Sequence, residues 1–273
     1  MSDAPRPPQA PGPRRRGLWI TVAVLSALLI VAPVSAEAWA QLARQSRSYT
    51  STETTEQHPV KAVEVDGGSS EVSVSAGTDS EVRIHQELNW SLRRPVVSKS
   101  WYGDTLKVST ACDGTLALTS LGCSVKLELA VPAGISVKVV SGSGPVRVSG
   151  LAGVLDVKST SGSVRLYGVR GPTHVRVGSG SVEGVALGSQ TVDAHAGSGE
   201  VSLDFAAPPR ELTGSVGSGE FSATLPPGSR YRVQGSARSG SREIDSALID
   251  PASDRVIDAS SGSGTVWLGY PRG

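Results

Sequence analysis

Apolar and polar residues alternate along most of the chain, in short runs separated by glycine and serine. From Lys61 to Ala76 the sequence is KAVEVDGGSSEVSVSA: an alternating run, a glycine turn and a second alternating run. Alternation with a period of two is typical of a half-buried β-strand, and a glycine turn between two such runs predicts two strands joined by a corner. The pattern therefore predicts an all-β fold.

The same two-strand unit recurs along the chain every 18 to 20 residues. A degenerate copy at Ile244 and a clear copy at Val266 follow the regular ones. Units of this length bury a core only by stacking on their neighbours, so we expect a β-solenoid or an elongated stack of two-strand repeats. The regular copies are marked by the first apolar residue after each turn: Val146, Val164, Val182, Val201 and Phe221.

Alternation also predicts which side chains point into this stack, because every second residue of a strand lies on the same face. The strand residues in phase with the markers should point inward, and those between them outward. The predicted inward residues are Val137, Val139, Val164, Leu166, Val175, Val177, Ala194, Ala196, Val201, Leu203, Phe205, Phe221, Ala223 and Leu225. The predicted outward residues are Lys138, Arg147, Lys158, Arg165, His174, Arg176, Glu183, Asp193, His195 and Asp204.

Glycine occupies most corners between the two strands of a repeat. Because glycine has no Cβ, it takes positive φ without a clash, and we predict that these residues are structural. The corner glycines are Gly142, Gly144, Gly162, Gly178, Gly180, Gly197, Gly199, Gly217, Gly219, Gly262 and Gly264.

The period breaks between Val72 and Val146, where longer strand candidates surround two cysteines. Residues 60–135 are therefore predicted to form a sheet-like N-terminal cap on the repeats of 136–273. Cys112 and Cys123 are the only cysteines and have ten residues between them. Both follow the N-terminal apolar run that is predicted below to cross a membrane, which places them in an oxidising compartment outside the cytoplasm. We therefore expect a disulfide. Two cysteines without a nearby histidine make a poor metal site.

An uncharged run from Gly17 to Ala36 follows three arginines, Arg14 to Arg16. As a helix, it would span about 30 Å, the thickness of the hydrocarbon core of a bilayer. Since arginines stay cytoplasmic, we predict a disordered cytoplasmic tail at 1–16, one transmembrane helix at 17–40, a polar stalk at 41–59 and an extracytoplasmic β-repeat domain at 60–273. The alternative is a cleavable signal peptide, cut after small residues at 34–36 or 38–40, which would make the protein secreted.

Charge and motifs give little support for catalysis or for nucleic-acid binding. The chain has 26 Lys and Arg against 25 Asp and Glu, so no global field favours nucleic acid. It contains no Gly-x-Ser-x-Gly elbow, no phosphate loop and no dinucleotide fingerprint. We therefore expect no catalytic residue, no cofactor and no metal ion.

Three weaker patterns remain on the predicted outward face. His174 aligns with Asp193, which suggests a histidine–acid cluster, although scattered surface residues give the same pattern. Glu200 and Glu220 could stack and bind a cation weakly. Trp267 should face outward near the last open edge of the sheet. The aromatic residues that could stack on sugars, or simply pack, are Trp90, Trp101, Tyr102, Trp267 and Tyr270.

The order of these features resembles the bacterial putative-adhesin family of β-strand-repeat proteins, a domain of unknown function of the DUF4097 type. The resemblance covers nearly the whole chain and implies an extracytoplasmic, mostly β protein, with no catalytic residues carried over. The matching stretches are Arg14 to Trp39, VEVDGGSSEVSV at 63–74, WYGDTLKV at 101–108, CSVKLELAVPAG at 123–134 and the SGSGPVRV-like repeats that follow.

These observations favour a non-enzymatic, membrane-anchored surface protein that acts as an adhesin or an envelope scaffold. One alternative is a binding or sensing module for cell-wall glycan or for another envelope protein. A remote alternative is a carbohydrate-active β-helix enzyme, which would need a cluster of outward carboxylates. An open sheet edge would also permit self-association.

Overall fold

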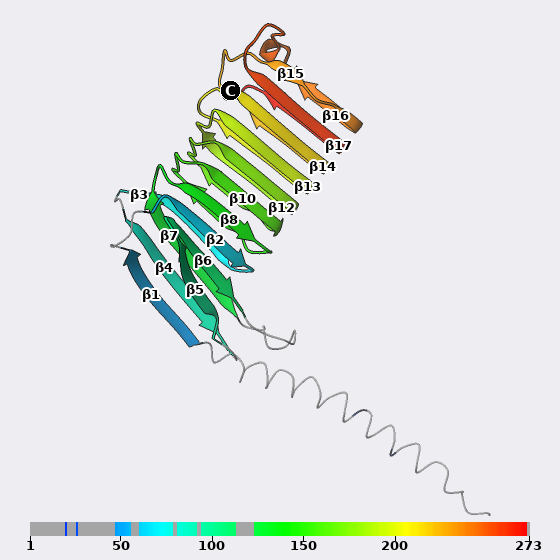
Figure 1. The fold of residues 1–273 in the computed structure, drawn as a ribbon. Coiled ribbons are helices and arrows are strands. Elements are labelled where there is room, and N and C mark those ends of the chain that lie inside the picture. The colour runs from blue at the N-terminus through cyan, green and yellow to red at the C-terminus, as the bar shows by residue number, and fades with distance from the viewer. Residues whose placement is uncertain are drawn as a thin grey trace, which may run out of the picture. The chain divides into compact units, whose positions relative to one another are not determined.

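Alternating residues form strands throughout the part of the chain that the structure describes (Figure 1). The structure is a computed structural model and describes residues 20, 26, 47–55, 60–78, 81–91, 94–112 and 123–271. Residues from Arg47 onward form one compact unit. Its elements are β1 (Arg47–Thr55), β2 (Ala62–Gly68), β3 (Glu71–Gly77), β4 (Val82–Trp90), β5 (Val96–Tyr102), β6 (Thr105–Ala111), β7 (Ser124–Pro132), β8 (Ser136–Ser141), β9 (Val146–Ser149), β10 (Leu155–Ser161), β11 (Val164–Tyr167), β12 (Thr173–Leu187), β13 (Thr191–Phe205), β14 (Glu211–Thr224), β15 (Arg232–Gln234), β16 (Ala237–Ile244), the 3-10 helix η1 (Ser246–Leu248) and β17 (Val256–Gly269).

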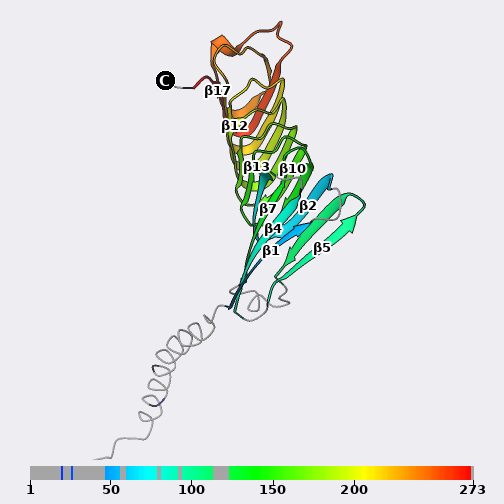
Figure 2. The same cartoon turned by 90° about the vertical axis from the view of Figure 1, so that its left-hand side faces the viewer.

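The repeats stack in parallel and in register, as the sequence predicts. The first strand of each repeat pairs with the first strand of the next, and the second with the second, which gives two ladders. Four long strands, β12, β13, β14 and β17, run through the corner and belong to both ladders (Figure 2). The marker residues form one continuous row across the second ladder: Val72, Val146, Val164, Val182, Val201, Phe221 and Val266.

The core lies between the two ladders and continues from one repeat to the next. All fourteen predicted inward residues are buried, from Val137 to Leu225, and they belong to one apolar cluster. None of the ten predicted outward residues is buried. Alternation therefore predicted the two faces of every regular repeat.

The N-terminal cap is smaller than predicted, and the folded part begins earlier. β2 and β3 form an ordinary repeat that pairs with β8 and β9. The irregular region is β4 to β7, in which β4 runs antiparallel to β7, and β5 antiparallel to β6. β1 adds to the outer edge of β4, so residues 47–55 are part of the sheet and the prediction that they form a stalk is wrong.

The predicted disulfide is present and joins the two ladders of the cap. Cys112 follows β6, which belongs to the first ladder, and Cys123 precedes β7, which belongs to the second. The crosslink therefore holds together two strands that lie on opposite sides of the core.

At the C-terminal end, the strands do not stack in chain order. β17 lies between β14 and β16, so the degenerate repeat is the outermost one. Arg242, and not Ile244, aligns with the marker Val266. The last open edge belongs to β15 and β16, and Trp267 lies one strand in from it, where β17 pairs with β16. A polar residue is tolerated at the Arg242 position because no further repeat packs over it.

Most corner glycines are needed because the backbone of the neighbouring repeat lies too close for a Cβ. Fewer are needed because φ is positive. Positive φ occurs in the later corners at Gly180, Gly199, Gly219 and Gly264. At the preceding glycines φ is not positive, but a Cβ would lie only 2.4–2.5 Å from the carbonyl oxygen of the repeat below. These close approaches occur at Gly178, Gly197, Gly217 and Gly262, and a Cβ at Gly142, Gly144 or Gly162 would meet a backbone oxygen at 2.9, 1.8 or 2.9 Å.

Among the described residues, no helix has the length and apolar character needed to cross a membrane. The predicted tail at 1–16 and the predicted transmembrane helix at 17–40 lie outside the described residues, apart from Ile20 and Ser26. So do residues 41–46 and 56–59 of the predicted stalk.

Candidate functional site: a row of charges on the first ladder

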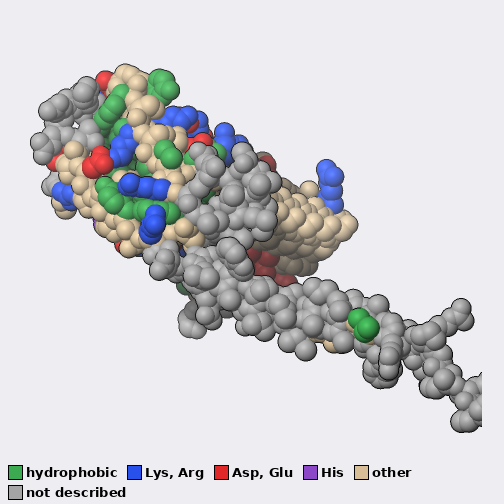
Figure 3. Space-filling view, turned by 90° about the horizontal axis from the view of Figure 1, so that it is seen from below, with side chains coloured by type: hydrophobic (Ala, Val, Ile, Leu, Met, Phe, Trp, Pro, Cys, Tyr) green, Lys and Arg blue, Asp and Glu red, His purple; other side chains and the backbone are tan. Residues whose placement is uncertain are grey.

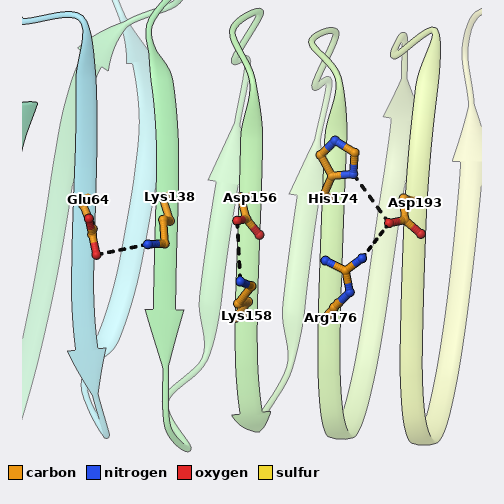
Figure 4. Close-up of polar contacts among 7 residues, drawn as sticks. All are labelled: Glu64, Lys138, Asp156, Lys158, His174, Arg176 and Asp193. Carbon is orange, nitrogen blue, oxygen red and sulfur yellow. Dashed lines mark hydrogen bonds and ion pairs between the residues drawn. The ribbon is translucent and has the colours of Figure 1, made fainter.

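A row of ionisable side chains crosses six neighbouring strands on the outward face of the first ladder. Figure 4 draws its members from Glu64 to Asp193. Parallel, in-register pairing places these residues side by side, and basic side chains alternate with acidic ones from one strand to the next. We call this row the charge ladder. In spatial order it consists of Lys107, Glu64, Lys138, Asp156, His174 and Asp193.

Glu64 joins the first three strands of the charge ladder. One of its carboxylate oxygens, Oε1, lies 3.3 Å from Nζ of Lys138 and 3.7 Å from Nζ of Lys107. Further along, Nζ of Lys158 lies 3.9 Å from Oδ2 of Asp156, on the same strand. Exposed pairs of this kind contribute little individually, but together the pairs between neighbouring strands favour the in-register alignment of those strands.

Asp193 is the most highly connected residue of the charge ladder. Its Oδ2 accepts a hydrogen bond of 3.0 Å from the Arg176 guanidinium and lies 3.6 Å from Nδ1 of His174. Its Oδ1 contacts Nε2 of His195. The predicted pairing of His174 with Asp193 is therefore present. Arg176 and His195, whose positions are offset by two residues, join it because they lie in the adjacent row of the same face.

The cluster also contains the three residue types of a serine hydrolase. Nδ1 of His195 lies 2.5 Å from Oγ of Ser215, which connects a serine, a histidine and an aspartate. Acyl transfer additionally needs hydrogen-bond donors for the oxyanion, commonly backbone N–H groups. Ser215 lies in β14, which is paired with a strand on each side. The geometry thus provides proton-transfer groups on an open sheet face without a backbone oxyanion hole at Ser215.

Beside the charge ladder, a hollow of about 400 Å³ opens on the same face. Lys158, Arg176 and His195 border it, and the bare backbone at Gly178 forms part of its floor. Asp156 and Asp193 already pair with these basic side chains, so the hollow lacks the uncompensated positive charge of a polyanion site.

The second ladder carries its own ion pairs on its outward face. Arg165 Nε donates a 2.9 Å hydrogen bond to Glu183, and Arg147 pairs with Glu71. The Lys126 ammonium lies 2.7 Å from Glu128. This hydrogen bond raises the pKa of Lys126 and lowers the pKa of Glu128, since it stabilises the charged form of each group.

The other residues singled out in the sequence lie elsewhere. Glu200 and Glu220 are directly opposite each other in neighbouring strands, as expected. No three metal-ligating side chains gather into a cation site within the described ranges. Trp267 and Tyr270 lie at the C-terminal end, far along the stack from the aromatic residues of the cap.

In the cap, the guanidinium of Arg94 lies 4.4 Å from the ring centre of Tyr49 and 5.5 Å from that of Trp90. Seen from below, the described surface shows Lys and Arg side chains among hydrophobic ones (Figure 3). Basic and aromatic side chains thus share this end, and no patch of one kind dominates it.

A scan against protein families matches residues 134–266, from the start of the regular repeats into β17, to Toastrack DUF4097. The repeat region is a Toastrack DUF4097 domain. The resemblance to the DUF4097 family seen in the sequence is thereby confirmed. A search of curated proteins gave no match.

Several solved structures are similar to this chain at low sequence identity. A putative adhesin from Bacteroides fragilis matches with a TM-score of 0.50 and 13% identity, over 81% of this chain and 97% of its own. A putative cell adhesion protein from Clostridium sporogenes matches with a TM-score of 0.43 and 11% identity, over 82% of this chain and all of its own. A putative lipid binding protein from Parabacteroides distasonis matches with a TM-score of 0.34 and 13% identity, over 80% and 96%.

Proposed function

We propose that this protein is a non-enzymatic, membrane-anchored protein of the cell surface, an adhesin or envelope scaffold whose Toastrack domain presents the charge ladder as a rigid outward face. The observation that carries this proposal is the register of six side chains, alternately basic and acidic, above a continuous apolar core. Since neighbouring charges of opposite sign neutralise one another, the electrostatic potential over this face is small. It suits a macromolecular partner with a matching arrangement of polar groups, recognised by complementarity and not by bulk charge.

The proposed location rests on the N-terminal sequence and on the disulfide. Three arginines before the apolar run from Gly17 to Ala36 favour a cytoplasmic N-terminus and an extracytoplasmic Toastrack domain. The disulfide between Cys112 and Cys123 fits an oxidising compartment.

The location is tested by labelling a single introduced thiol on intact cells. Both native cysteines are in the disulfide, so a membrane-impermeant maleimide would react only with a new cysteine. Ser198→Cys, at an exposed corner, should be labelled on intact cells. Ser2→Cys, in the predicted cytoplasmic tail, should be labelled only after lysis. Labelling of Ser2→Cys alone on intact cells would reverse the orientation.

The role is tested by deleting the protein from its host and comparing cell adhesion and envelope integrity. We expect a defect that wild-type protein restores and that a variant with a neutralised ladder, Lys138→Gln with Asp156→Asn, restores poorly. Full rescue by that variant would show that the charge ladder is not the functional face. Hydrolysis of any glycan by the pure protein would contradict a non-enzymatic role.

A glycan-binding or protein-binding module is the second candidate, and aromatic side chains at the C-terminal end favour it. Sedimentation of the protein with isolated cell-wall sacculi, beside a tube of protein alone, separates the two candidates. Pelleting only with sacculi supports a wall-binding module, whereas solubility in both tubes leaves a scaffold that binds another protein.

A further inference from the structure

A second outward surface lies on the second ladder, at the C-terminal end of the stack. Because β17 lies between β14 and β16, outward residues of these three strands line up in rows around Trp267. We call this region the Trp267 surface. Its rows are Glu220, Thr265 and Ser241; then Ser222, Trp267 and Glu243; then Thr224 and Gly269.

Trp267 is held against the sheet at the centre of this surface. A Cβ on Gly269 would lie 2.4 Å from Cζ2 and 2.7 Å from Cη2 of the indole, so the ring covers the backbone of Gly269. A glycine two residues after the tryptophan therefore gives the ring room to lie along the strand. The indole borders two hollows, of about 390 and 640 Å³.

Carboxylates and hydroxyl groups surround the indole. The smaller hollow is lined by Glu220, Ser222, Thr224, Glu243, Thr265, Trp267 and Tyr270, a set with two carboxylates and no Lys or Arg. Tyr270 is fixed by its hydroxyl group, which donates hydrogen bonds to the backbone oxygens of Ser229 (2.8 Å) and Ala247 (3.2 Å). Trp267 and the two glutamates lie on paired strands, and Tyr270, which directly follows β17, is held by its hydrogen bonds, so these groups are preorganised.

We propose that the Trp267 surface binds a carbohydrate, namely an oligosaccharide of pyranose rings that are uncharged or carry an amino group. A pyranose has an apolar C–H face, which suits an aromatic ring, and hydroxyl groups at its rim, which donate hydrogen bonds to carboxylates. The two glutamates repel acidic sugars and attract protonated amines. This inference rests on the second candidate of the proposed function, a glycan-binding module, and names its site and ligand class; it is independent of the charge ladder.

The test is isothermal titration calorimetry of the full-length protein with three defined hexasaccharides. The protein is kept in a zwitterionic detergent without a sugar headgroup, because the chain contains the apolar run from Gly17 to Ala36. The probes are chitohexaose, which is uncharged, its de-acetylated form, which is cationic, and a hyaluronan hexasaccharide, which is anionic. We expect saturable binding of the first two, tighter for the cationic one, and none of hyaluronan.

Two variants and one control tie binding to this surface. Trp267→Ala should weaken binding of both sugars about tenfold or more, as expected for a central aromatic contact. Glu243→Gln keeps the Trp267 ring in place. It should weaken the binding of the cationic sugar more than the binding of the uncharged one. Tyr102→Ala, which removes an aromatic side chain that is 68% exposed in the cap, should leave binding unchanged.

The inference is overturned by the absence of saturable binding, by equal binding of hyaluronan, or by wild-type affinity of a folded Trp267→Ala variant. Dimerisation of the protein that masks this surface would overturn it too, and sedimentation velocity detects such a dimer. None of these outcomes affects the labelling and deletion experiments, which report on location and on the charge ladder.

Discussion

The Asp193 carboxylate contacts basic side chains from its own strand and from the neighbouring strand. His174 and Arg176 lie on β12 and His195 on β13, all on the same face. Like charges on adjacent strands repel, so without Asp193 this part of the face would lose its balance of charge.

We therefore expect Asp193→Asn to lower the free energy of unfolding at pH 7 by about 1 kcal/mol, measured by urea denaturation. The Asp193 side chain is only 19% exposed, so solvent screens these contacts less than it screens a fully exposed pair. Asp204→Asn on the same strand, where the carboxylate is exposed, is the matched control and should change stability by less than about 0.5 kcal/mol. Equal effects of the two substitutions would contradict the role of Asp193.

Tyr231 differs from Asp193, which has several polar partners, because its hydroxyl group is buried without a hydrogen-bond partner of good geometry. The residue is fully buried in the end of the core, and its hydroxyl makes no hydrogen bond within the described residues. Burial raises the pKa of the phenol, because the charged form is poorly solvated there.

Tyr231→Phe should therefore be as stable as wild type at pH 7 or more stable by up to about 1 kcal/mol. The folded protein holds the phenol proton more tightly than the unfolded chain, so stability is full below about pH 10 and falls as the pH rises above it. The variant should lose less stability than wild type between pH 9 and pH 11 in chemical denaturation. If wild type and variant lost the same free energy of unfolding over this pH range, groups other than Tyr231 would cause the loss of stability at high pH.

At the scale of the element, the stacked corners bring backbone atoms closer together than a side chain allows. Gly219 has a φ of 128°, and a Cβ there would lie 1.9 Å from the carbonyl oxygen of Gly199. Both the conformation and the contact require glycine.

Gly219→Ala should lower the free energy of unfolding by more than about 2 kcal/mol, which thermal unfolding would detect as a lower midpoint. Gly134→Ala is the matched control, since a Cβ there meets nothing within 4 Å and φ is not positive. Its effect should be within about 1 kcal/mol and of either sign. A small effect at Gly219 would mean that the stacked corners relax easily.

Sequence patterns predicted the regular repeats because each strand has one buried face, which imposes a period of two on residues such as Val175, Val177 and Val182. β1 was missed for the same reason: it is an edge strand, RSYTSTETT, and none of its residues 47–54 is buried. The outward side chains of the charge ladder were predicted one by one. Their contacts follow from the strand register, which joins residues about 18 or more positions apart.

The order of the last strands could not be predicted, because similar repeats fit one another in more than one sequence of stacking. Only Arg242 at the marker position distinguishes β16 as an outer strand. The Trp267 surface depends on that order, since Glu243 lies beside Trp267 only when β16 is the neighbour of β17.

At the scale of the whole molecule, this order makes the C-terminal strand an internal one. A chain that ends at Asp250 lacks β17, so β14 keeps β13 but loses its neighbour on the other side, and β15 and β16 lose the strand they pair with. We expect this truncated protein to lose cooperative unfolding and to be cleaved by proteases at the C-terminal repeats. Circular dichroism melts and limited proteolysis measure both properties.

The matched control deletes the outer repeat and keeps β17. Replacing residues 227–254 by a short Gly-Ser loop removes β15 and β16 and lets β17 stack directly on β14. This protein should keep a cooperative transition, although it loses more residues than the truncated one. If both variants lost cooperative unfolding and protease resistance to the same extent, the internal position of β17 would not explain the loss.

The position of β17 also bears on how the protein is made. Synthesis from the N-terminus produces β16 before β17, so this outer strand is made before the strand that it pairs with in the described part of the chain. The stack cannot close progressively to its end. It closes only when β17 inserts between β14 and β16, so a chain in which β17 is missing or not yet folded keeps an uncovered edge on β14 that proteases and chaperones can recognise.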